Sequence, residues 1–426
     1  MQIGGLTTGR HGALVVGLVL LVAACSGDDR PPGSDATTSG SPVTVAQIAA
    51  GNTEDVPSAL DNLTDERFPA ALLDPDQLLA GGPPPDGIPS IDEPKFLPTD
   101  RVDFLDDDEP VLALQVGDDA RAYPVQVLIW HEIVNDTLDG IPVAVTYCPL
   151  CNSAVAYDRR LDDRVLSFGT SGMLYNSALV MYDRQTESLW SHFTGQAVIG
   201  HLAGKRLDVF AVSTISWGDW RDANPDGLVL SRDTGHDRDY GTNPYPGYDD
   251  IDTAPFLFDG DTDGRLAAKE RVVGIEIDGD AVAVRLGPLT DKGVSDIDIA
   301  GNQLVVWAQP GTASALDDPI VAGGRDVGAT GVFRPIVDNQ ALTFERRGDG
   351  FVDHQTNSHW NVLGQATDGP LTGTALEAVP HVDTFWFAWA AFQPDTQIVP
   401  LPAAAAAPPR REPARGSSGR DVYNSV

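Results

Sequence analysis

Two cysteines and a histidine are the residues of this sequence best suited to chemistry. The runs EIVNDTL and IPVAVTY flank the pair Asp139 and Gly140, a pattern typical of a two-residue β-hairpin. Counting outward from that turn places His131 opposite Cys148, and opposed residues have Cβ atoms about 4.5 to 5.5 Å apart. The string CPLC then brings Cys151 back to the same corner. The spacing therefore predicts that one imidazole and two thiols converge.

Such a group is suited to binding a transition metal. Two thiols and an imidazole, with a thioether nearby, suit copper, and the same set with a carboxylate such as Asp136 suits zinc. Further candidate ligands in the same part of the chain are Met173, Met181 and His192. Our first hypothesis is a metal site, with copper favoured over zinc, that serves electron transfer or metal handling.

Two other classes of function remain open. The Cys148 and Cys151 pair is also typical of a thiol–disulfide oxidoreductase, in which His131 would lower the pKa of the attacking thiol. An inert local disulfide between the two cysteines is the third reading of the pair. A non-catalytic surface module could instead bind an unknown protein or small-molecule partner through the aromatic loop 237–250. The string HEIVN lacks the second histidine of a metalloprotease motif, because position 135 is Asn.

The elements that must position these residues occur twice. Residues 111–155 align without a gap onto 272–316, and DRQTESLW, ending at Trp190, matches DHQTNSHW, ending at Trp360. Period-two runs such as VLALQV and ARAYPV dominate both copies, so we expect a mainly β (β-rich α+β) fold with an internal duplication. The second copy carries Lys292, Gln309 and Thr312 at the positions of the proposed ligands, so only the first copy keeps their chemistry.

The N-terminus predicts export and lipid attachment. An apolar run ends in LVAAC, which resembles a bacterial lipobox, so we expect cleavage before Cys25, lipidation of that residue and anchoring to the outer face of the cell membrane. The expected organisation is a signal peptide (1–24), a lipid-anchored flexible tether (25–45), an N-terminal extension (46–99), a first unit with the CPLC site (100–230), a connecting segment (231–270), a second unit lacking the site (271–400) and a disordered tail (401–426).

The charge of the chain excludes one class of partner. With 28 Lys and Arg against 62 Asp and Glu, the net charge is −34 over 426 residues. Such a surface does not neutralise phosphates, so we expect no nucleic-acid partner.

The connecting segment contains a possible calcium loop. Asp259, Asp261, Asp263, Gly264 and Glu270 occupy positions 1, 3, 5, 6 and 12 of an EF-hand-type pattern. The stretch TAPFLFDG before it reads as extended rather than helical, so an acidic surface turn is the competing interpretation.

Several strings resemble one bacterial family. WHEIVND, VTYCPLC and the YG-x-x-PY-x-x-Y loop are similar to motifs of the family called domain of unknown function 3179, over most of residues 100–400. The resemblance implies a related fold and no assigned reaction. It also implies another role for Glu270, which lies in a family string, RL-x-x-KE, that does not need the acidic residues before it.

Overall fold

The computed structural model describes residues 57–401. The signal peptide, Cys25, the whole tether, residues 46–56 of the N-terminal extension and nearly all of the C-terminal tail lie outside the described residues. Within 57–401, no helix is long and apolar enough to cross a membrane.

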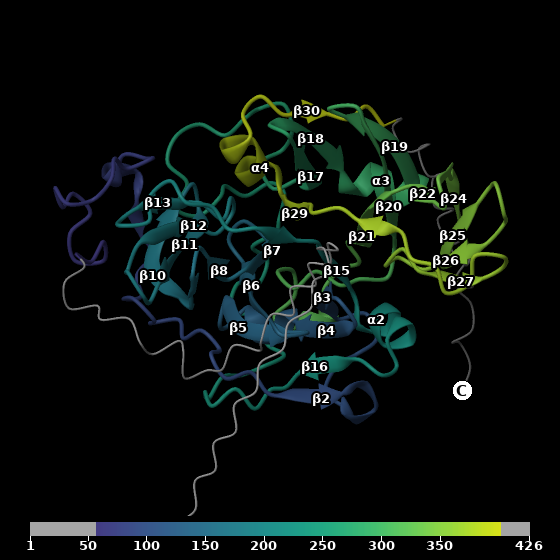
Figure 1. The fold of residues 1–426 in the computed structure, drawn as a ribbon, viewed down its shortest axis with the longest axis horizontal. Coiled ribbons are helices and arrows are strands. Elements are labelled where there is room, and N and C mark those ends of the chain that lie inside the picture. The colour runs from purple at the N-terminus through teal and green to yellow at the C-terminus, as the bar shows by residue number, and fades with distance from the viewer. Residues whose placement is uncertain (1–56, 402–426) are drawn as a thin grey trace, which may run out of the picture. The chain divides into compact units, whose positions relative to one another are not determined.

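The first unit is built almost entirely of short strands, as the period-two pattern predicts (Figure 1). The one-turn helix η2 (Pro75–Gln77) and β1 (Leu79–Ala80) precede it. Its elements are β2 (Phe96–Pro98), η3 (Thr99–Arg101), β3 (Pro110–Val116), β4 (Asp119–Pro124), α1 (Val125–Leu128), β5 (Ile133–Leu138), β6 (Ile141–Cys148), β7 (Ser153–Asp158), β8 (Arg160–Leu161), β9 (Arg164–Val165), β10 (Phe168–Tyr175), β11 (Ala178–Asp183), β12 (Leu189–Ser191), β13 (Ala197–Ile199), β14 (Val209–Phe210), β15 (Val212–Ser216), α2 (Trp217–Ala223) and β16 (Leu228–Leu230).

The second unit repeats that order of elements. It contains β17 (Arg271–Ile277), β18 (Asp280–Arg285), α3 (Leu286–Lys292), β19 (Val294–Ile299), β20 (Asn302–Gln309), η4 (Val321–Gly323), β21 (Ala329–Arg334), β22 (Ile336–Val337), β23 (Gln340–Ala341), β24 (Phe344–Arg347), β25 (Gly350–Asp353), β26 (His359–Trp360), β27 (Ala366–Asp368), β28 (Glu377–Ala378), β29 (Val382–Phe385), α4 (Trp386–Phe392) and β30 (Gln397–Ile398). The fold is mainly β, as predicted.

Corresponding strands form corresponding sheets. The sheet β14-β7-β6-β5 has its counterpart in β28-β21-β20-β19, and β15-β3-β4-β16-β2 in β29-β17-β18-β30. In both units the last strand joins in parallel, as β16 on β4 and β30 on β18. A third pair of sheets, β10-β11-β12-β13 with β1 and β24-β25-β26-β27, completes the two units.

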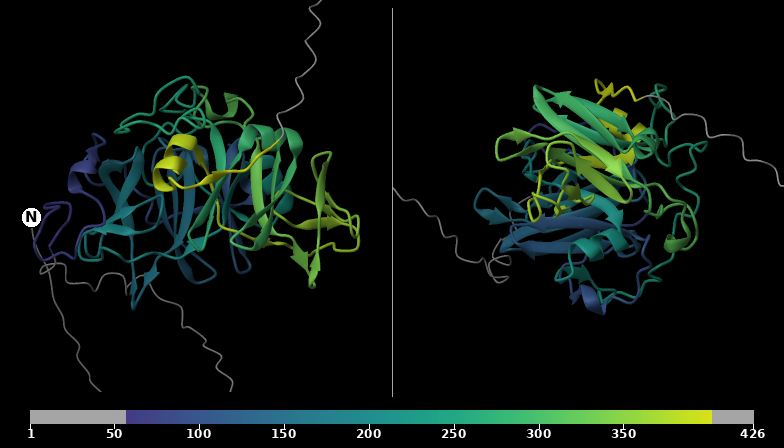
Figure 2. Two further views of the ribbon diagram at one scale, coloured as in Figure 1. Left: turned by 90° about the horizontal axis from the view of Figure 1, so that it is seen from above. Right: turned by 90° about the vertical axis from the view of Figure 1, so that its right-hand side faces the viewer.

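The two units pack on each other reciprocally. β7 of the first unit lies beside β29 of the second, and β21 of the second lies beside β15 of the first. Figure 2 shows the green and yellow strands of the second unit beside the blue and teal strands of the first. One apolar core includes both Cys148 and the residues of α4, so each unit buries apolar surface of the other.

The predicted hairpin is confirmed. β5 and β6 pair with Leu138 opposite Ile141 and Val134 opposite Val145, and Asp139 and Gly140 form the turn with positive φ angles of 44° and 74°.

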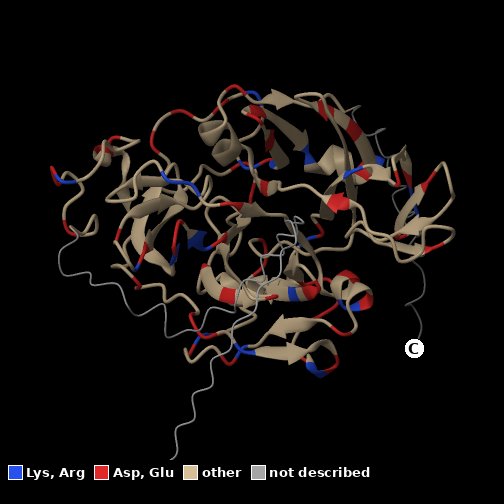
Figure 3. Cartoon of the chain, in the orientation of Figure 1, with Lys and Arg blue, Asp and Glu red and all other residues tan. Residues whose placement is uncertain are grey.

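Figure 3 shows Asp and Glu spread over the loops and strand ends, with fewer Lys and Arg between them. The acidic residues thus lie mostly around the core that holds the cysteines.

Candidate functional site

The CPLC string forms a tight turn between two paired strands. β6 ends at Cys148, β7 begins at Ser153, and these two residues pair across the ladder. Asn152 closes the turn with a φ of 49°, a conformation that Asn tolerates better than most residues. Both thiols are free, and Cys148 and Cys151 are 1% and 0% exposed. The turn therefore holds a reduced dithiol inside the core.

The two thiols differ in acidity. Burial raises the pKa of Cys148, but hydrogen bonds from the Cys151 thiol and from nearby backbone N–H groups outweigh it and hold that pKa below its ordinary value. Burial and the Cys148 sulfur raise the pKa of Cys151 well above its ordinary value. Because the thiolate is the nucleophilic form of cysteine, these shifts make Cys148 the more readily ionised thiol and Cys151 the less readily ionised one.

A hydrogen-bonded chain holds Cys151 from behind. Its Sγ lies 2.9 Å from Ser153 Oγ, which lies 2.8 Å from His192 Nε2. Burial lowers the pKa of His192 to about 3, so the imidazole is neutral at neutral pH. A neutral imidazole with so low a pKa does not take up the thiol proton, so Ser153 and His192 orient Cys151 rather than ionise it.

Glu132 is the buried acid of the site. It is 7% exposed, has a φ of 59°, and its carbonyl accepts a hydrogen bond of 2.8 Å from the N–H of Tyr147. Burial raises the pKa of Glu132 well above its ordinary value, and the charge of the nearby Cys148 thiolate adds to the rise. The site therefore favours the protonated form of this carboxyl group, next to Cys148. A left-handed backbone at a non-glycine residue is a strain that is found preferentially at functional sites.

The structure does not bring His131 to the sulfurs. Strand pairing begins only at Ile133, because the turn after α1 continues through Glu132, whose N–H bonds the carbonyl of Leu128. The predicted pairing of His131 with Cys148 is therefore wrong. His131 Nδ1 lies 2.7 Å from the Pro89 carbonyl oxygen, and its Nε2 lies 2.6 Å from the Tyr240 hydroxyl.

The other proposed metal ligands lie in separate surroundings. Asp136 is bound by Arg121 and by the hydroxyl of Tyr123, and Met181 is buried opposite Trp190 in the β11–β12 pair. Met173 packs with a small cluster of apolar residues near the N-terminal extension. Across residues 57–401, no three His, Cys, Asp or Glu side chains are arranged to hold a metal ion. Only His192, through Ser153, is linked to the thiols.

Two acidic residues of the proposed calcium loop form ion pairs with arginines. Asp263 forms an ion pair of 2.7 Å with Arg265, and Glu270 pairs with Arg285. No hydrogen bond joins Asp259 or Asp261 to another group in the described part of the chain. Calcium would have to compete with both arginines for its ligands.

The aromatic loop 237–250 covers the thiol turn. The Tyr248 hydroxyl donates a hydrogen bond of 2.9 Å to the carbonyl of Leu150, between the two cysteines, and the ammonium of Lys269 lies 3.9 Å from the centre of the Tyr248 ring. Tyr245 is partly buried near Glu132 and Cys148, and the Tyr240 hydroxyl lies 2.6 Å from His131 Nε2. The tyrosines of this loop therefore point into the protein and close the site.

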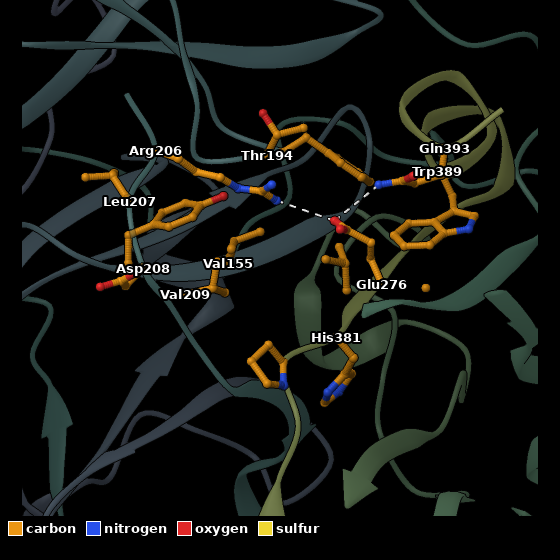
Figure 4. Close-up of a pocket in the computed structure, with 15 residues that line it drawn as sticks. Val155, Thr194, Arg206, Leu207, Asp208, Val209, Glu276, His381, Trp389 and Gln393 are labelled. Atoms are coloured by element: carbon orange, nitrogen blue, oxygen red, sulfur yellow. Dashed lines mark hydrogen bonds and ion pairs between the residues drawn. The ribbon is translucent and has the colours of Figure 1, made fainter. Parts of the chain in front are cut away.

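A pocket of about 390 Å³ lies behind β7, between the two units. Figure 4 shows Arg206 and Gln393 reaching Glu276 from two sides, each at 3.4 Å, with Trp389 and His381 on the wall. Val155 and Tyr157 of its lining follow Ser153 at alternate positions of one strand and so share its face of the sheet. None of the lining residues is a cysteine, so the pocket lies near the dithiol and does not reach it.

Sequence reasoning missed Glu132 and Ser153 as site residues. Glu132 lies inside the WHEIVND string, which was the available signal. Ser153 has a counterpart at Ser314 in the second unit, which has no thiols, and its contact with His192 has no local signature.

Fold and site together define a β-rich protein of two similarly built units, with a buried dithiol in the first. The chain belongs to the family described as "Protein of unknown function (DUF3179)", whose model matches residues 85–396. No curated protein and no solved structure matches the chain.

Proposed function

We propose that the protein is a thiol–disulfide oxidoreductase that uses Cys148 and Cys151. The observation that carries the proposal is the pair of free, buried thiols in one tight turn, in which the pKa of Cys148 is lowered and the pKa of Cys151 is raised. A structural cysteine pair needs no such polarisation, whereas a nucleophilic thiol and a resolving thiol do.

The residues present account for each step. The Cys148 thiolate attacks one sulfur of a substrate disulfide, the substrate S–S bond breaks, and the leaving sulfur takes a proton from Glu132. Cys151 then attacks Cys148, its proton goes to the second substrate sulfur, and that sulfur leaves. The substrate gains two electrons and two protons, the protein ends with a Cys148–Cys151 disulfide, and Glu132 regains its proton from water. The reverse sequence oxidises a dithiol substrate.

Access to Cys148 requires the covering loop to move. With Cys148 1% exposed, a disulfide reaches it only when Tyr248 leaves the Leu150 carbonyl. The loop then acts as a cover that excludes water while the two sulfurs exchange partners. In this proposal the aromatic loop serves the thiol site and is not a separate binding module.

Trapping the intermediate tests this function. The Cys151→Ser variant, reduced and then treated with oxidised glutathione, should accumulate glutathione on Cys148, detected as a mass increase. The wild-type protein should instead form its internal disulfide and release two glutathione molecules. Gln309→Ala, at the position in the second unit that matches Cys148, is the control and should react as the wild type does. If neither thiol of the wild-type protein reacts with oxidised glutathione or iodoacetamide before unfolding, the proposal fails.

Copper binding is the second candidate, favoured by the convergence of two sulfurs in a buried turn. Cu(I) is a soft ion that suits thiolates, whereas zinc takes four ligands and these two sulfurs would supply half of them. Anaerobic titration with Cu(I) should saturate at one ion per chain, and Cys148→Ser should abolish that binding. Because His131 is engaged elsewhere, His131→Ala should leave it unchanged.

Export and lipid attachment at Cys25 complete the proposal. The LVAAC string supports it, and an oxidising compartment would supply disulfide substrates for the dithiol. The protein would then face the outside of the cell membrane, and its partner there would carry an exchangeable disulfide.

A further inference from the structure

A small cavity lies where the two units meet, next to the thiol turn. Its volume is about 30 Å³, and Tyr147 and Asn152, which flank the cysteines, contribute to its lining. Corresponding positions of the two units line it together, as in the pairs Pro110 and Arg271, Val125 and Leu286, Asn152 and Ala313, and Thr214 and Asp383.

Three polar atoms of the lining have no hydrogen-bond partner among residues 57–401. They are Arg271 Nε, Thr312 Oγ1 and Asp383 Oδ1, and all three are buried. Other atoms of the two charged residues are engaged: Arg271 Nη2 donates to Asp249 and Ser314, and Asp383 Oδ2 accepts a hydrogen bond of 2.6 Å from Thr330. The unpartnered atoms therefore belong to residues that line the cavity.

Thr312 lines the cavity at the position in the second unit that matches a thiol in the first. It corresponds to Cys151, and it is 1% exposed. Gln309, which corresponds to Cys148, likewise has a buried Oε1 with no partner in the described part of the chain, while its Nε2 donates to Asp219. The second unit thus has polar groups where the first has its thiols.

The charged and polar groups that line the cavity limit the kind of molecule that it can hold. A guanidinium N–H disfavours a cation, a carboxyl group disfavours an anion, and a hydroxyl both donates and accepts. Water satisfies all three, and it needs about 10 to 15 Å³ of such volume for each molecule. Leaving buried polar groups unpaired is unfavourable, and most such groups in proteins find a partner.

We infer that this cavity holds two ordered water molecules that bridge Arg271, Thr312 and Asp383. The waters form a hydrated joint between the units, in contact with the Tyr147 and Asn152 side of the thiol turn. At the position that corresponds to Cys151, the second unit thus has a hydroxyl group that binds water instead of a thiol.

Two variants of the full-length protein test the joint through the sign of a melting-temperature change. Thr312→Val keeps the side-chain shape and removes the hydroxyl, and Thr312→Ser keeps the hydroxyl. If water binds the hydroxyl, Thr312→Val lowers the melting temperature, because a hydrogen bond is lost and the water loses a partner. If the cavity is dry, the same change raises it, because an unpaired hydroxyl is removed, and the inference is overturned.

Thr146→Val calibrates the expected size of the effect. Its hydroxyl is equally buried and donates a hydrogen bond of 2.8 Å to the Val155 carbonyl, so the variant reports the loss of one satisfied hydroxyl. We expect Thr312→Val to lower the melting temperature by a similar amount and Thr312→Ser to lower it less. A crystal structure at a resolution that shows ordered water should place a peak within hydrogen-bond distance of Thr312 Oγ1. Absence of such a peak would also overturn the inference.

Discussion

The carbonyl oxygen of Cys151 accepts a hydrogen bond of 2.7 Å from the hydroxyl of Thr384, which lies 233 residues further along the chain. The N–H of Phe385 donates a second bond to the same carbonyl, at 3.1 Å. The second unit, which has no thiols in the corresponding turn, therefore fixes the backbone at Cys151 of the first unit.

Thr384→Val should destabilise the protein by about 1 kcal/mol, because one buried hydrogen bond is lost while the Phe385 bond remains. Urea unfolding measures that loss. The reduction potential of the dithiol should change as well, because the turn is freer to adopt the geometry of a disulfide. The exposed Thr367→Val is the control, and equal potentials in wild type and Thr384→Val would mean that the bond has no part in positioning Cys151.

Glu132→Gln should slow the reduction of oxidised glutathione by on the order of 100-fold, because Gln has no proton to give to the leaving sulfur. Gln resembles protonated Glu in size and charge, so the pH at which Cys148 becomes alkylated should stay unchanged. Stopped-flow rates and iodoacetamide labelling across pH measure the two quantities. An unaltered exchange rate would remove Glu132 from the mechanism.

His192→Gln should make the protein less sensitive to acid. The pKa of His192 falls from 6.5 to about 3 on folding, so between these values the unfolded chain binds more protons than the folded one. Its contribution to stability is complete above pH 6.5 and declines as the pH falls toward 3, by about 1.4 kcal/mol for each pH unit. Urea unfolding between pH 4.5 and 7.5 gives the slope. The exposed His354→Gln should keep the wild-type slope, and the same slope in His192→Gln would contradict the prediction.

Calcium binding at residues 259–270 remains a prediction with a simple measurement. Added calcium should raise the melting temperature, a chelator should reverse the rise, and Asp259→Ala should abolish it. Since Arg265 and Arg285 already neutralise Asp263 and Glu270, millimolar calcium is the expected range, as for the weaker extracellular sites. Identical melting curves with calcium and with chelator would end this hypothesis.

Lipid attachment at Cys25 predicts that the protein expressed in its host partitions into the detergent phase and sediments with membranes. Cys25→Ser should prevent both, because it removes the sulfur that takes the lipid. Fractionation followed by immunoblotting distinguishes the two forms, and a wild-type protein found wholly in the aqueous phase would contradict the anchor.

The sequence predicted the features that depend on neighbouring residues along the chain, namely the hairpin register and the thiol turn. The Asp139 and Gly140 turn determines the register of β5 and β6, because a two-residue loop leaves one pairing, and the CPLC turn follows from its length. His131 was misplaced because a helical turn carries it away from the ladder. That turn depends on the left-handed Glu132, and no periodicity in the sequence marks such a residue.

The contact between Ser153 and His192 joins residues 39 apart, across the sheets that contain β7 and β12. A pattern within one strand cannot reveal which strand of another sheet will face it. The hydrogen bonds of Thr384 and Tyr248 to the thiol turn have the same origin in tertiary packing. The sequence thus predicted that the two sulfurs lie together, but the hydrogen-bond partners around them follow only from the tertiary fold.

The reciprocal packing of β7 on β29 also determines when the thiols become protected. Synthesis runs from the N-terminus, so Cys148 and Cys151 exist for a long interval before the strand that binds the Cys151 carbonyl has been made. Pairings so distant in sequence form slowly, because a large loop must close first. Throughout that interval the Cys151 carbonyl lacks the two hydrogen bonds that Thr384 and Phe385 donate in the folded protein.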